Sequence, residues 1–237
     1  MIPDLSFVIP ARNAEAWLAE TIGSCIGQMY KGIEIIVVDD ASEDSTRRIM
    51  DWYASKEPRV KPVYCRGAGN RGAARNAGIA QATAPILAML DADDLCSQDR
   101  ARETLRAFSN GIEWVCSGAE IIDSISEPIG QRLEPGIPTL ARLLDTGLAH
   151  IVHSTMAMRA TICKTYPYDE GEYQAVGLDD WHLQTRLLAD GAALAYIPRI
   201  LVGWRQHVSN TVSTRNPETV KALKDKFLEG FRAKTVA

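Results

Sequence analysis

Short apolar runs alternate with segments of helical periodicity along the first half of the chain. The helical segments carry apolar residues three or four positions apart, as at Leu18, Ile22 and Cys25, which predicts amphipathic helices. Apolar runs of strand length lie at residues 5–9, 34–38, 59–64, 86–90 and 113–117. Strands that alternate with helices over short connections are typical of a parallel sheet covered on both faces. We therefore predict an α/β fold with a Rossmann-like, mostly parallel sheet flanked by helices.

Polar residues predict where two of the helices begin. Asn13 follows the first strand, and Ser42 follows the second. Both side chains can accept backbone N–H groups, so we predict both residues as helix N-caps. Glu43 and Asp44 then suit the first turn of a helix, where the dipole favours negative charge.

The second half of the chain has a less regular pattern. Residues 154–159 alternate like a strand, and residues 200–204 form a further apolar run. Three prolines and two glycines within residues 128–138 predict a loop or lid. Asp179 opens a helix that Gly191 ends, and residues 217–234 have the pattern of an amphipathic helix. No shift in composition marks a boundary, so we predict a single domain over residues 1–237.

The composition narrows the class of protein. The 237 residues are 46% hydrophobic and 24% charged, as in ordinary globular proteins. The net charge of −4 argues against a nucleic-acid-binding protein, which usually carries a basic excess. The five cysteines are odd in number and contain no C-x-x-C pair, so we expect reduced thiols in a cytoplasmic protein. No apolar run reaches membrane-spanning length, and the N-terminal apolar stretch is too short for a signal peptide.

Polar residues gather where the predicted strands end. Ligands on parallel sheets bind outside the carboxyl ends of the strands, and here these ends hold Asp39, Asp40, Asp91 and Asp93. Asp91 and Asp93 are two positions apart, which puts both side chains on the same side of an extended chain. Clustered carboxylates repel one another, and a divalent cation would compensate them. The alternative is that Asp94 simply begins the next helix.

A Gly-rich turn suggests an alternative function. Residues 67–72 read GAGNRG and fit G-x-G-x-x-G, and Asp91 follows at nearly the spacing of a dinucleotide fingerprint. That interpretation predicts an NAD-dependent oxidoreductase. Against it, the motif follows the third strand, whose Lys61 and Pro62 suit a sheet margin. It also leaves Asp40, Asp93 and the 179–180 pair without a role.

Several stretches match a known family in the family's order. They are VIPARN (8–13), IVVDDAS (36–42), GAARNAG (72–78), LDADD (90–94), DDWHL (179–183) and WRQH (204–207), followed by Asn210 and Ser213. On these stretches the chain resembles the inverting glycosyltransferases of family 2, which have the GT-A fold. The resemblance covers roughly residues 5–213. It implies a nucleotide-sugar-binding half over about 1–117, an acceptor-side half over about 118–215 and a C-terminal helix over 216–237.

The resemblance implies a donor site for a nucleotide-diphosphate sugar, most often a UDP-sugar. Asp40 would accept a hydrogen bond from the base, while Asp39 is better explained as the cap of its strand end. The nucleotide-sugar contacts carried over from the family are Pro10, Ala11, Asn13, Asp40, Gly72, Arg75, Asp91 and Ala92. Asp93 and His207 would hold Mg²⁺ or Mn²⁺ against the two phosphates. The dinucleotide enzyme and a non-catalytic sugar-nucleotide binder stay open as alternatives.

The resemblance also implies a general base and an acceptor. The family carries the base in a Glu-Asp pair, and this chain has Asp179 and Asp180 instead. We predict Asp180 as the base and Asp179 as the second candidate, with a helix cap as the alternative role of Asp179. The acceptor would be a saccharide or a lipid-linked hydroxyl. The C-terminal helix would then pack on its own domain or contact an anionic membrane surface.

Overall fold

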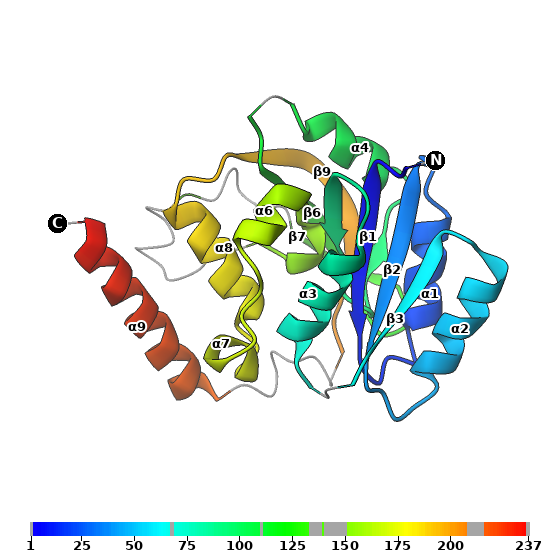
Figure 1. The fold of residues 1–237 in the computed structure, drawn as a ribbon, viewed down its shortest axis with the longest axis horizontal. Helices are drawn as coiled ribbons and strands as arrows, with labels where there is room; N and C mark the ends of the chain where they lie inside the picture. The colour runs from blue at the N-terminus through cyan, green and yellow to red at the C-terminus, as the bar shows by residue number, and fades with distance from the viewer. Residues whose placement is uncertain are drawn as a thin grey trace.

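The computed structural model describes residues 2–66, 69–109, 111–132, 139, 151–207 and 216–235. These residues form one mixed sheet in the order β3-β2-β1-β4-β8-β6-β9-β5, with β7 paired to β6 (Figure 1). The strands are β1 (Leu5–Ala11), β2 (Ile33–Asp40), β3 (Val60–Cys65), β4 (Ile86–Met89), β5 (Leu95–Cys96), β6 (Trp114–Ile122), β7 (Pro128–Arg132), β8 (Ala157–Arg159) and β9 (Leu194–Arg205).

The predicted parallel arrangement is confirmed for the first part of the sheet. β1 pairs in parallel with β2 and β4, and β2 pairs in parallel with β3. Beyond β4 the sheet is mixed, because β8 is antiparallel to both β4 and β6. The carboxyl ends of β1, β2 and β4 therefore meet at one edge of the sheet.

Helices cover both faces of this sheet, as the alternating pattern predicts. They are α1 (Leu18–Ile26), α2 (Thr46–Lys56), α3 (Arg71–Gln81), α4 (Arg100–Ala107), α6 (Ala160–Thr165), α7 (Glu172–Ala175), α8 (Asp179–Ala189) and α9 (Pro217–Thr235), with a 3₁₀ turn η1 (His153–Thr155). The apolar sides of α1, α2 and α4 pack on one face around Phe7 and Ile35. Helices α6 and α8 pack on the other face around Leu87 and Met89.

The prediction of Asn13 and Ser42 as N-caps is wrong. Helix α1 begins at Leu18, and α2 begins at Thr46. Asn13 has a positive φ of 48°, and its side chain accepts the Glu43 N–H at 2.9 Å. The Ser42 hydroxyl accepts the Asn13 N–H at 3.0 Å. The two residues thus join the loops that follow β1 and β2, and this cross-connection shapes the sheet edge.

Three predictions in the second half need correction. Residues 154–159 were expected to form one strand, but the 3₁₀ turn η1 precedes the short strand β8. Within the predicted loop or lid, residues 128–132 form β7, which pairs antiparallel with β6, while residues 133–138 lie outside the described residues. Strand β9 is 12 residues long and extends well before the predicted residues 200–204.

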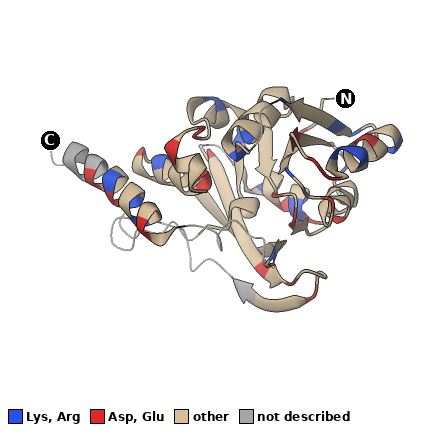
Figure 2. Cartoon of the chain, turned by 90° about the horizontal axis from the view of Figure 1, so that it is seen from below, with Lys and Arg blue, Asp and Glu red and all other residues tan. Residues whose placement is uncertain are grey.

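The C-terminal helix α9 uses its apolar side on the protein itself. Phe227 contacts the rings of Tyr173, Trp181 and His182 at centroid distances of 6.1, 5.7 and 5.3 Å. Trp181 is only 6% exposed, so it packs in the core rather than presenting a platform for an acceptor sugar. Lysine and acidic residues occur along the part of α9 that is coloured by residue type in Figure 2.

None of the helices in the described part of the chain has the length and apolar character needed to cross a bilayer.

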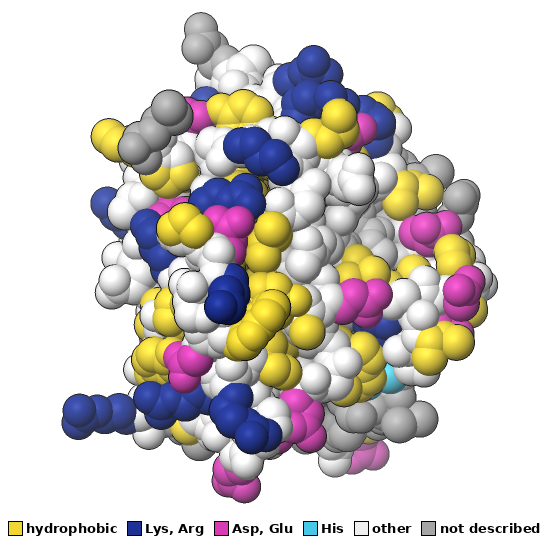
Figure 3. All heavy atoms as spheres, turned by 90° about the vertical axis from the view of Figure 1, so that its right-hand side faces the viewer, with side chains coloured by type: hydrophobic (Ala, Val, Ile, Leu, Met, Phe, Trp, Pro, Cys, Tyr) yellow, Lys and Arg dark blue, Asp and Glu magenta, His cyan; other side chains and the backbone are white. Residues whose placement is uncertain are grey.

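Strand β3 forms one edge of the sheet. The face at the α2 end of the molecule carries hydrophobic side chains interspersed with lysine and arginine (Figure 3). Trp52 on α2 is 58% exposed and Tyr64 on β3 is 38% exposed, and the Arg47 guanidinium lies 4.3 Å from the centre of the Tyr64 ring. Lys61 and Pro62 within β3 discourage pairing with another strand, as their positions in the sequence suggested.

Candidate functional site

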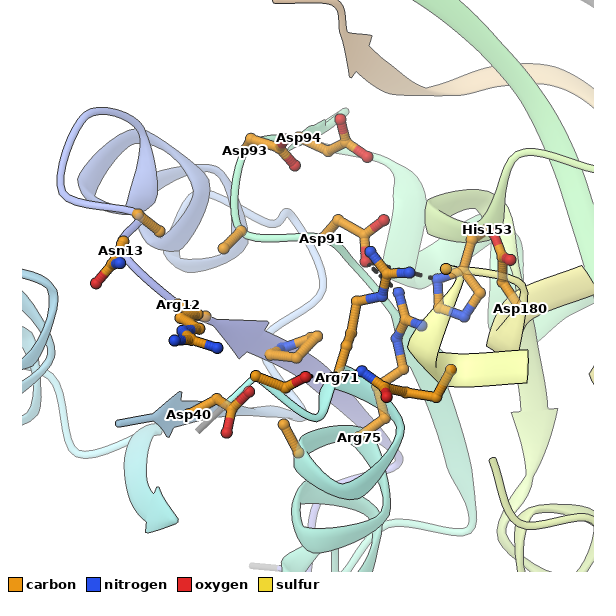
Figure 4. Close-up of a pocket in the computed structure, with 18 of the residues that line it drawn as sticks. Arg12, Asn13, Asp40, Arg71, Arg75, Asp91, Asp93, Asp94, His153 and Asp180 are labelled. Carbon is orange, nitrogen blue, oxygen red and sulfur yellow. Dashed lines mark hydrogen bonds and ion pairs between the residues drawn. The ribbon is translucent and has the colours of Figure 1, made fainter. Parts of the chain in front are cut away.

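A cavity of about 890 Å³ opens at the carboxyl ends of β1, β2 and β4 (Figure 4). Residues from the start of α3, the 3₁₀ turn η1 and the start of α8 complete its wall. Ten of the predicted site residues line this cavity: Pro10, Ala11, Asn13, Asp40, Arg75, Asp91, Ala92, Asp93, Asp180 and His207. The folded chain therefore brings together residues that are up to about 200 positions apart in the sequence.

The two aspartates at the end of β2 have different environments. Asp39 is 3% exposed, and its side chain accepts the Ser42 N–H at 3.0 Å, which matches the cap expected for it. Asp40 lines the cavity instead. Burial raises the pKa of Asp40, although nearby N–H groups and the charge of Arg12 oppose this effect. The carboxylate of Asp40 could therefore accept a hydrogen bond from a ligand at this end of the cavity.

Gly72, the second residue of α3, has a packing role. It is not among the residues that line the cavity. A Cβ atom on Gly72 would lie 2.0 Å from the carbonyl oxygen of Asp169, so only glycine lets the backbone before α7 come this close. The expected direct contact between Gly72 and the nucleotide gains no support from this geometry.

A buried ion-pair network crosses the floor of the cavity. The Arg75 guanidinium pairs with Asp91 at 2.7 Å and also with Asp179, and Arg71 pairs with Asp179 at 2.8 Å. Burial alone would raise the pKa values of Asp91 and Asp179, but the arginine charges outweigh it and lower both. Both carboxylates are therefore held in the ionised form.

Asp179 and Asp180 differ in what they can reach. Asp179 is fully buried, and both of its oxygens pair with arginines. It therefore has no oxygen available for a substrate hydroxyl, which argues against its role as the second candidate base. Leu178 occupies the N-cap position of α8, so Asp179 is not the cap either. Asp180 lines the cavity and accepts the Trp181 N–H at 2.7 Å.

Asp93 and His207 form a pair on the opposite wall. His207 Nε2 lies 2.9 Å from Asp93 Oδ2, and the His207 ring stacks on Trp17 with 4.1 Å between centroids. Burial and the charge of Asp91 raise the pKa of Asp93 despite the opposing effect of His207. Asp94 has its pKa raised still further, mainly by burial and then by Asp93.

These carboxylates fit a divalent cation. Asp94 Oδ2 is buried with no hydrogen-bond partner among the described residues, and burial followed by neighbouring carboxylates raises the pKa values of Asp93 and Asp94. No group of three or more His, Cys, Asp or Glu side chains in the described ranges has the arrangement of a metal site. Asp93 and His207 could therefore supply only part of a coordination shell, and oxygens of a ligand would have to complete it.

Arg205 supports this wall from behind. It is fully buried and donates to the Asp93 carbonyl at 2.6 Å, while it pairs with Glu20 at 2.8 Å. Its own N–H donates to Asp94 at 2.8 Å. Because Arg205 is fully buried and its side chain is engaged with these partners, it supports the wall rather than facing a ligand.

The wall residues absent from the predicted site include Arg12, Trp17, Arg71 and His153. Arg71 lies four positions before Arg75, and residues at this spacing share a helix face, so the helical pattern could have revealed it. His153 lies just before the segment interpreted as a strand, residues 154–159. Arg12 lies within the VIPARN stretch that carries the resemblance, whereas no local signal marks Trp17 as a wall residue.

Comparison with known sequences gives a family and several relatives. The family described as glycosyl transferase family 2 matches residues 6–166. An uncharacterised glycosyltransferase of Nostoc sp. is 30% identical over 175 residues, which are 70% of this chain and 54% of that protein. The succinoglycan biosynthesis protein ExoO of Rhizobium meliloti is 30% identical over 160 residues, 67% of this chain and 44% of that protein. The chain thus spans about half the length of these relatives.

Comparison with solved structures gives the same fold at low sequence identity. Residues 1–349 of TarS from S. aureus, in complex with UDP-GlcNAc, align with a TM-score of 0.74 and 17% identity over 96% of this chain and 71% of that one. The mannosyltransferase PcManGT from Pyrobaculum calidifontis, in complex with GDP-Man and Mn²⁺, aligns with a TM-score of 0.65 and 17% identity, over 100% of this chain and 65% of that one.

Proposed function

The chain belongs to glycosyl transferase family 2, and we propose that it moves a sugar from a UDP-sugar to a hydroxyl group of a saccharide or lipid-linked acceptor, with inversion at the sugar. This transfer would serve polysaccharide or glycoconjugate assembly. One observation carries the proposal: Asp40, the Asp93–His207 pair and Asp180 all line one cavity of about 890 Å³. Family membership also sets aside the dinucleotide interpretation of the Gly-rich turn, of which Gly67 and Ala68 lie outside the described residues.

The donor nucleotide would lie along the ends of β1 and β2. Asp40 would accept an N–H of uracil, and Pro10, Ala11 and Asn13 would line the nucleotide. Asp91 and Ala92 would meet the ribose. Of the two structural neighbours, TarS was solved with UDP-GlcNAc and PcManGT with GDP-Man. The choice of UDP for this chain therefore rests on the pairing of Asp40 with the base.

Asp93 and His207 would hold Mg²⁺ or Mn²⁺ beside the diphosphate. Such an ion, when bound, neutralises negative charge on the leaving diphosphate. The neighbour PcManGT was solved with Mn²⁺. The buried and underpaired carboxylate of Asp94 supports this assignment, because a nearby cation would compensate its charge and that of Asp93.

Asp180 would act as the general base. It would take the proton from the acceptor hydroxyl as that oxygen attacks the sugar on the side opposite the diphosphate. It lies in the first turn of α8, at the positive end of the helix dipole. The burial and ion pairs of Asp179 leave Asp180 as the carboxylate of this pair that lines the cavity.

Binding of UDP, GDP and NAD, each measured by calorimetry with and without Mn²⁺, tests the donor assignment. We expect UDP to bind in the presence of Mn²⁺ and to bind at least ~10-fold more weakly without it, because ion and diphosphate complete one coordination shell. We expect no binding of NAD. Binding of NAD without any binding of UDP would overturn the proposal, and tighter binding of GDP than UDP would overturn the choice of nucleotide.

A further inference from the structure

An unbroken series of ion pairs links the end of β4 to the start of α8. Asp91, just after β4, pairs with Arg75 at 2.7 Å, and Arg75 pairs in turn with Asp179, the first residue of α8. The side chain of Arg75 is 1% exposed and that of Asp179 is 0% exposed. Figure 4 shows the Arg71 and Arg75 guanidinium groups between Asp91 and the α8 side of the cavity.

His153 and Tyr168 make further contacts with the same network. His153 Nε2 lies 2.8 Å from the Tyr168 hydroxyl, and His153 Nδ1 lies 3.7 Å from Asp91. The Arg75 guanidinium also lies over the Tyr168 ring, 5.2 Å from its centre. The network therefore connects four separate segments of the chain: the end of β4, helix α3, the 3₁₀ turn η1 and the start of α8.

Such a network is a poor source of stability, because the desolvation of buried ions offsets much of their attraction. Its charges balance, with two arginines facing two aspartates. What the network does supply is fixed geometry, since Arg75 is a planar fork that can hold two carboxylates at once. It sets the distance between Asp91 on the donor side and the first turn of α8.

The same contacts keep Arg75 away from a ligand. Both of its terminal nitrogens bind carboxylates, so a contact with a phosphate would require breaking a buried ion pair. Arg71 lines the same cavity with 28% of its side chain exposed. The cation that faces a bound diphosphate from α3 is therefore Arg71 and not Arg75.

We propose that Arg75 is a positioning residue for transfer, and that Asp179 is the anchor through which it sets the place of Asp180. Adjacent residues on a helix do not face each other, so fixing Asp179 inward turns Asp180 toward the cavity. This inference rests on the proposed function, because it gives Asp180 the role of base. It replaces the expected contact of Arg75 with the nucleotide.

A double-mutant cycle with Arg75→Lys and Asp179→Asn tests the proposal. We would measure UDP release from UDP-GlcNAc as the probe donor, the Kd for UDP with Mn²⁺, and the pH dependence of kcat. Asp179→Asn should lower kcat at least ~10-fold and leave the Kd for UDP within ~3-fold, because Asp91 keeps its arginine. The double variant should lose no more kcat than Arg75→Lys alone, since both changes break one linkage.

The pH profile separates positioning from simple structural support. The Asp179→Asn change removes a negative charge beside Asp180 and leaves Arg71 and Arg75 without that partner. The acid limb of the pH profile, where kcat falls as the pH decreases, should therefore move to lower pH. Asp179→Glu keeps the charge and should retain kcat within ~10-fold of the parent. Glu34→Gln is the matched control, because Glu34 is equally buried, at 2% exposure, but does not line the cavity; it should leave kcat and the limb unchanged.

The results that would overturn the proposal differ from those that would overturn the function. Arg75 is a nucleotide contact if Arg75→Lys raises the Kd for UDP at least ~10-fold with kcat unchanged. The same conclusion follows if the losses of kcat in the two single variants multiply in the double variant. A crystal structure of Asp179→Asn tests the proposal without any measurement of turnover. If that variant does not fold, the structure of Asp179→Glu serves instead. A displaced Asp180 supports the proposal, and an unmoved one contradicts it. Failure of the parent to use any sugar nucleotide counts against the function alone.

Discussion

Asp179 and Asp180 are neighbours in the chain, yet one is sealed in an ion-pair network and the other lines the cavity. The sequence ranked Asp180 first only through the family resemblance. It could not show that Asp179 is buried, because its partner Arg75 lies 104 positions away. The same holds for Arg205, whose partner Glu20 is 185 positions away. Local patterns identify polar residues at strand ends, but long-range pairing decides which of them face a ligand.

Asp93 should be required for the metal dependence of nucleotide binding. Replacing Asp93 with Asn removes a charged oxygen ligand but keeps the size of the side chain, so Mn²⁺ should no longer strengthen UDP binding. Calorimetry of UDP with and without Mn²⁺ measures this effect. Asp190→Asn, on an exposed residue at the end of α8, is the matched control and should behave as the parent. An Mn²⁺ effect of full size in Asp93→Asn would refute the ligand role.

Glu34 links the stability of the sheet to pH. Its carboxylate accepts from Ser6 and from the Thr83 N–H at 2.6 Å each and pairs with Lys61. Burial acts to raise its pKa, but these partners together lower it from 4.5 to about 2. A group with a lowered pKa in the folded state stabilises the protein above its unfolded pKa, and this contribution disappears as the pH falls from 4.5 toward 2.

Replacing Glu34 with Gln should therefore reduce stability most at neutral pH. The shift of the Glu34 pKa corresponds to ~3 kcal/mol in the free energy of unfolding. Urea denaturation of parent and variant between pH 2 and pH 7 should show a difference of this order at pH 7 that shrinks toward pH 2. A difference that stays constant with pH would mean that the charge of Glu34 does not stabilise the fold.

At the scale of elements, the sequence predicts continuous apolar strands well and interrupted ones poorly. Strand β9 continues through Pro198 and Arg199, which are exposed and break the apolar pattern. Its pairing with β6 shifts register there, because Ile197 pairs with Ser117 and Ile200 pairs with Gly118. The bulge lets the exposed Pro-Arg pair interrupt the strand without ending it, and a pattern of alternation cannot reveal this.

Gly72 controls the approach of α3 to the backbone before α7. Replacing Gly72 with Ala would place a Cβ atom 2.0 Å from the Asp169 carbonyl oxygen, so the two segments must separate at a cost of ~1–3 kcal/mol. Thermal denaturation should detect the loss. Gly23→Ala in α1 is the control, because its Cβ would meet only the Tyr53 hydroxyl at 4.0 Å; it should leave stability unchanged or raise it. Equal stability of Gly72→Ala and the parent would contradict the packing role.

Phe227 should hold α9 on the rest of the protein. Replacing Phe227 with Ala removes its ring contacts with Tyr173, Trp181 and His182. Hydrogen exchange should therefore rise along α9 and at the start of α8 while β1 and β2 stay protected, because local opening does not require the core to unfold. Protection of α9 equal to that in the parent would show that other contacts hold the helix.

At the scale of the whole molecule, the two halves of the chain build one cavity. Asp40, Asp91 and Asp93 come from the strands of the first half, and Asp180 and His207 come from the second. The alternating pattern predicted the α/β fold, and the resemblance predicted ten of the residues that line the cavity, because its motifs lie at strand ends that a parallel sheet gathers at one edge. Neither could predict the mixed arrangement beyond β4, since the pairing partners of a strand are not encoded in its own apolar pattern.

The most direct test of the account is turnover of nucleotide sugars by the parent and by Asp180→Asn. A panel of UDP- and GDP-sugars would be incubated with Mn²⁺ and simple saccharides, and release of the nucleoside diphosphate would be measured. We predict release from at least one UDP-sugar, a fall in kcat of ~10²–10⁴-fold in Asp180→Asn, as expected for the loss of a general base, and unchanged binding of UDP. Equal turnover by both proteins would exclude Asp180 as the base, and binding of UDP with no release from any sugar nucleotide would show a non-catalytic binder.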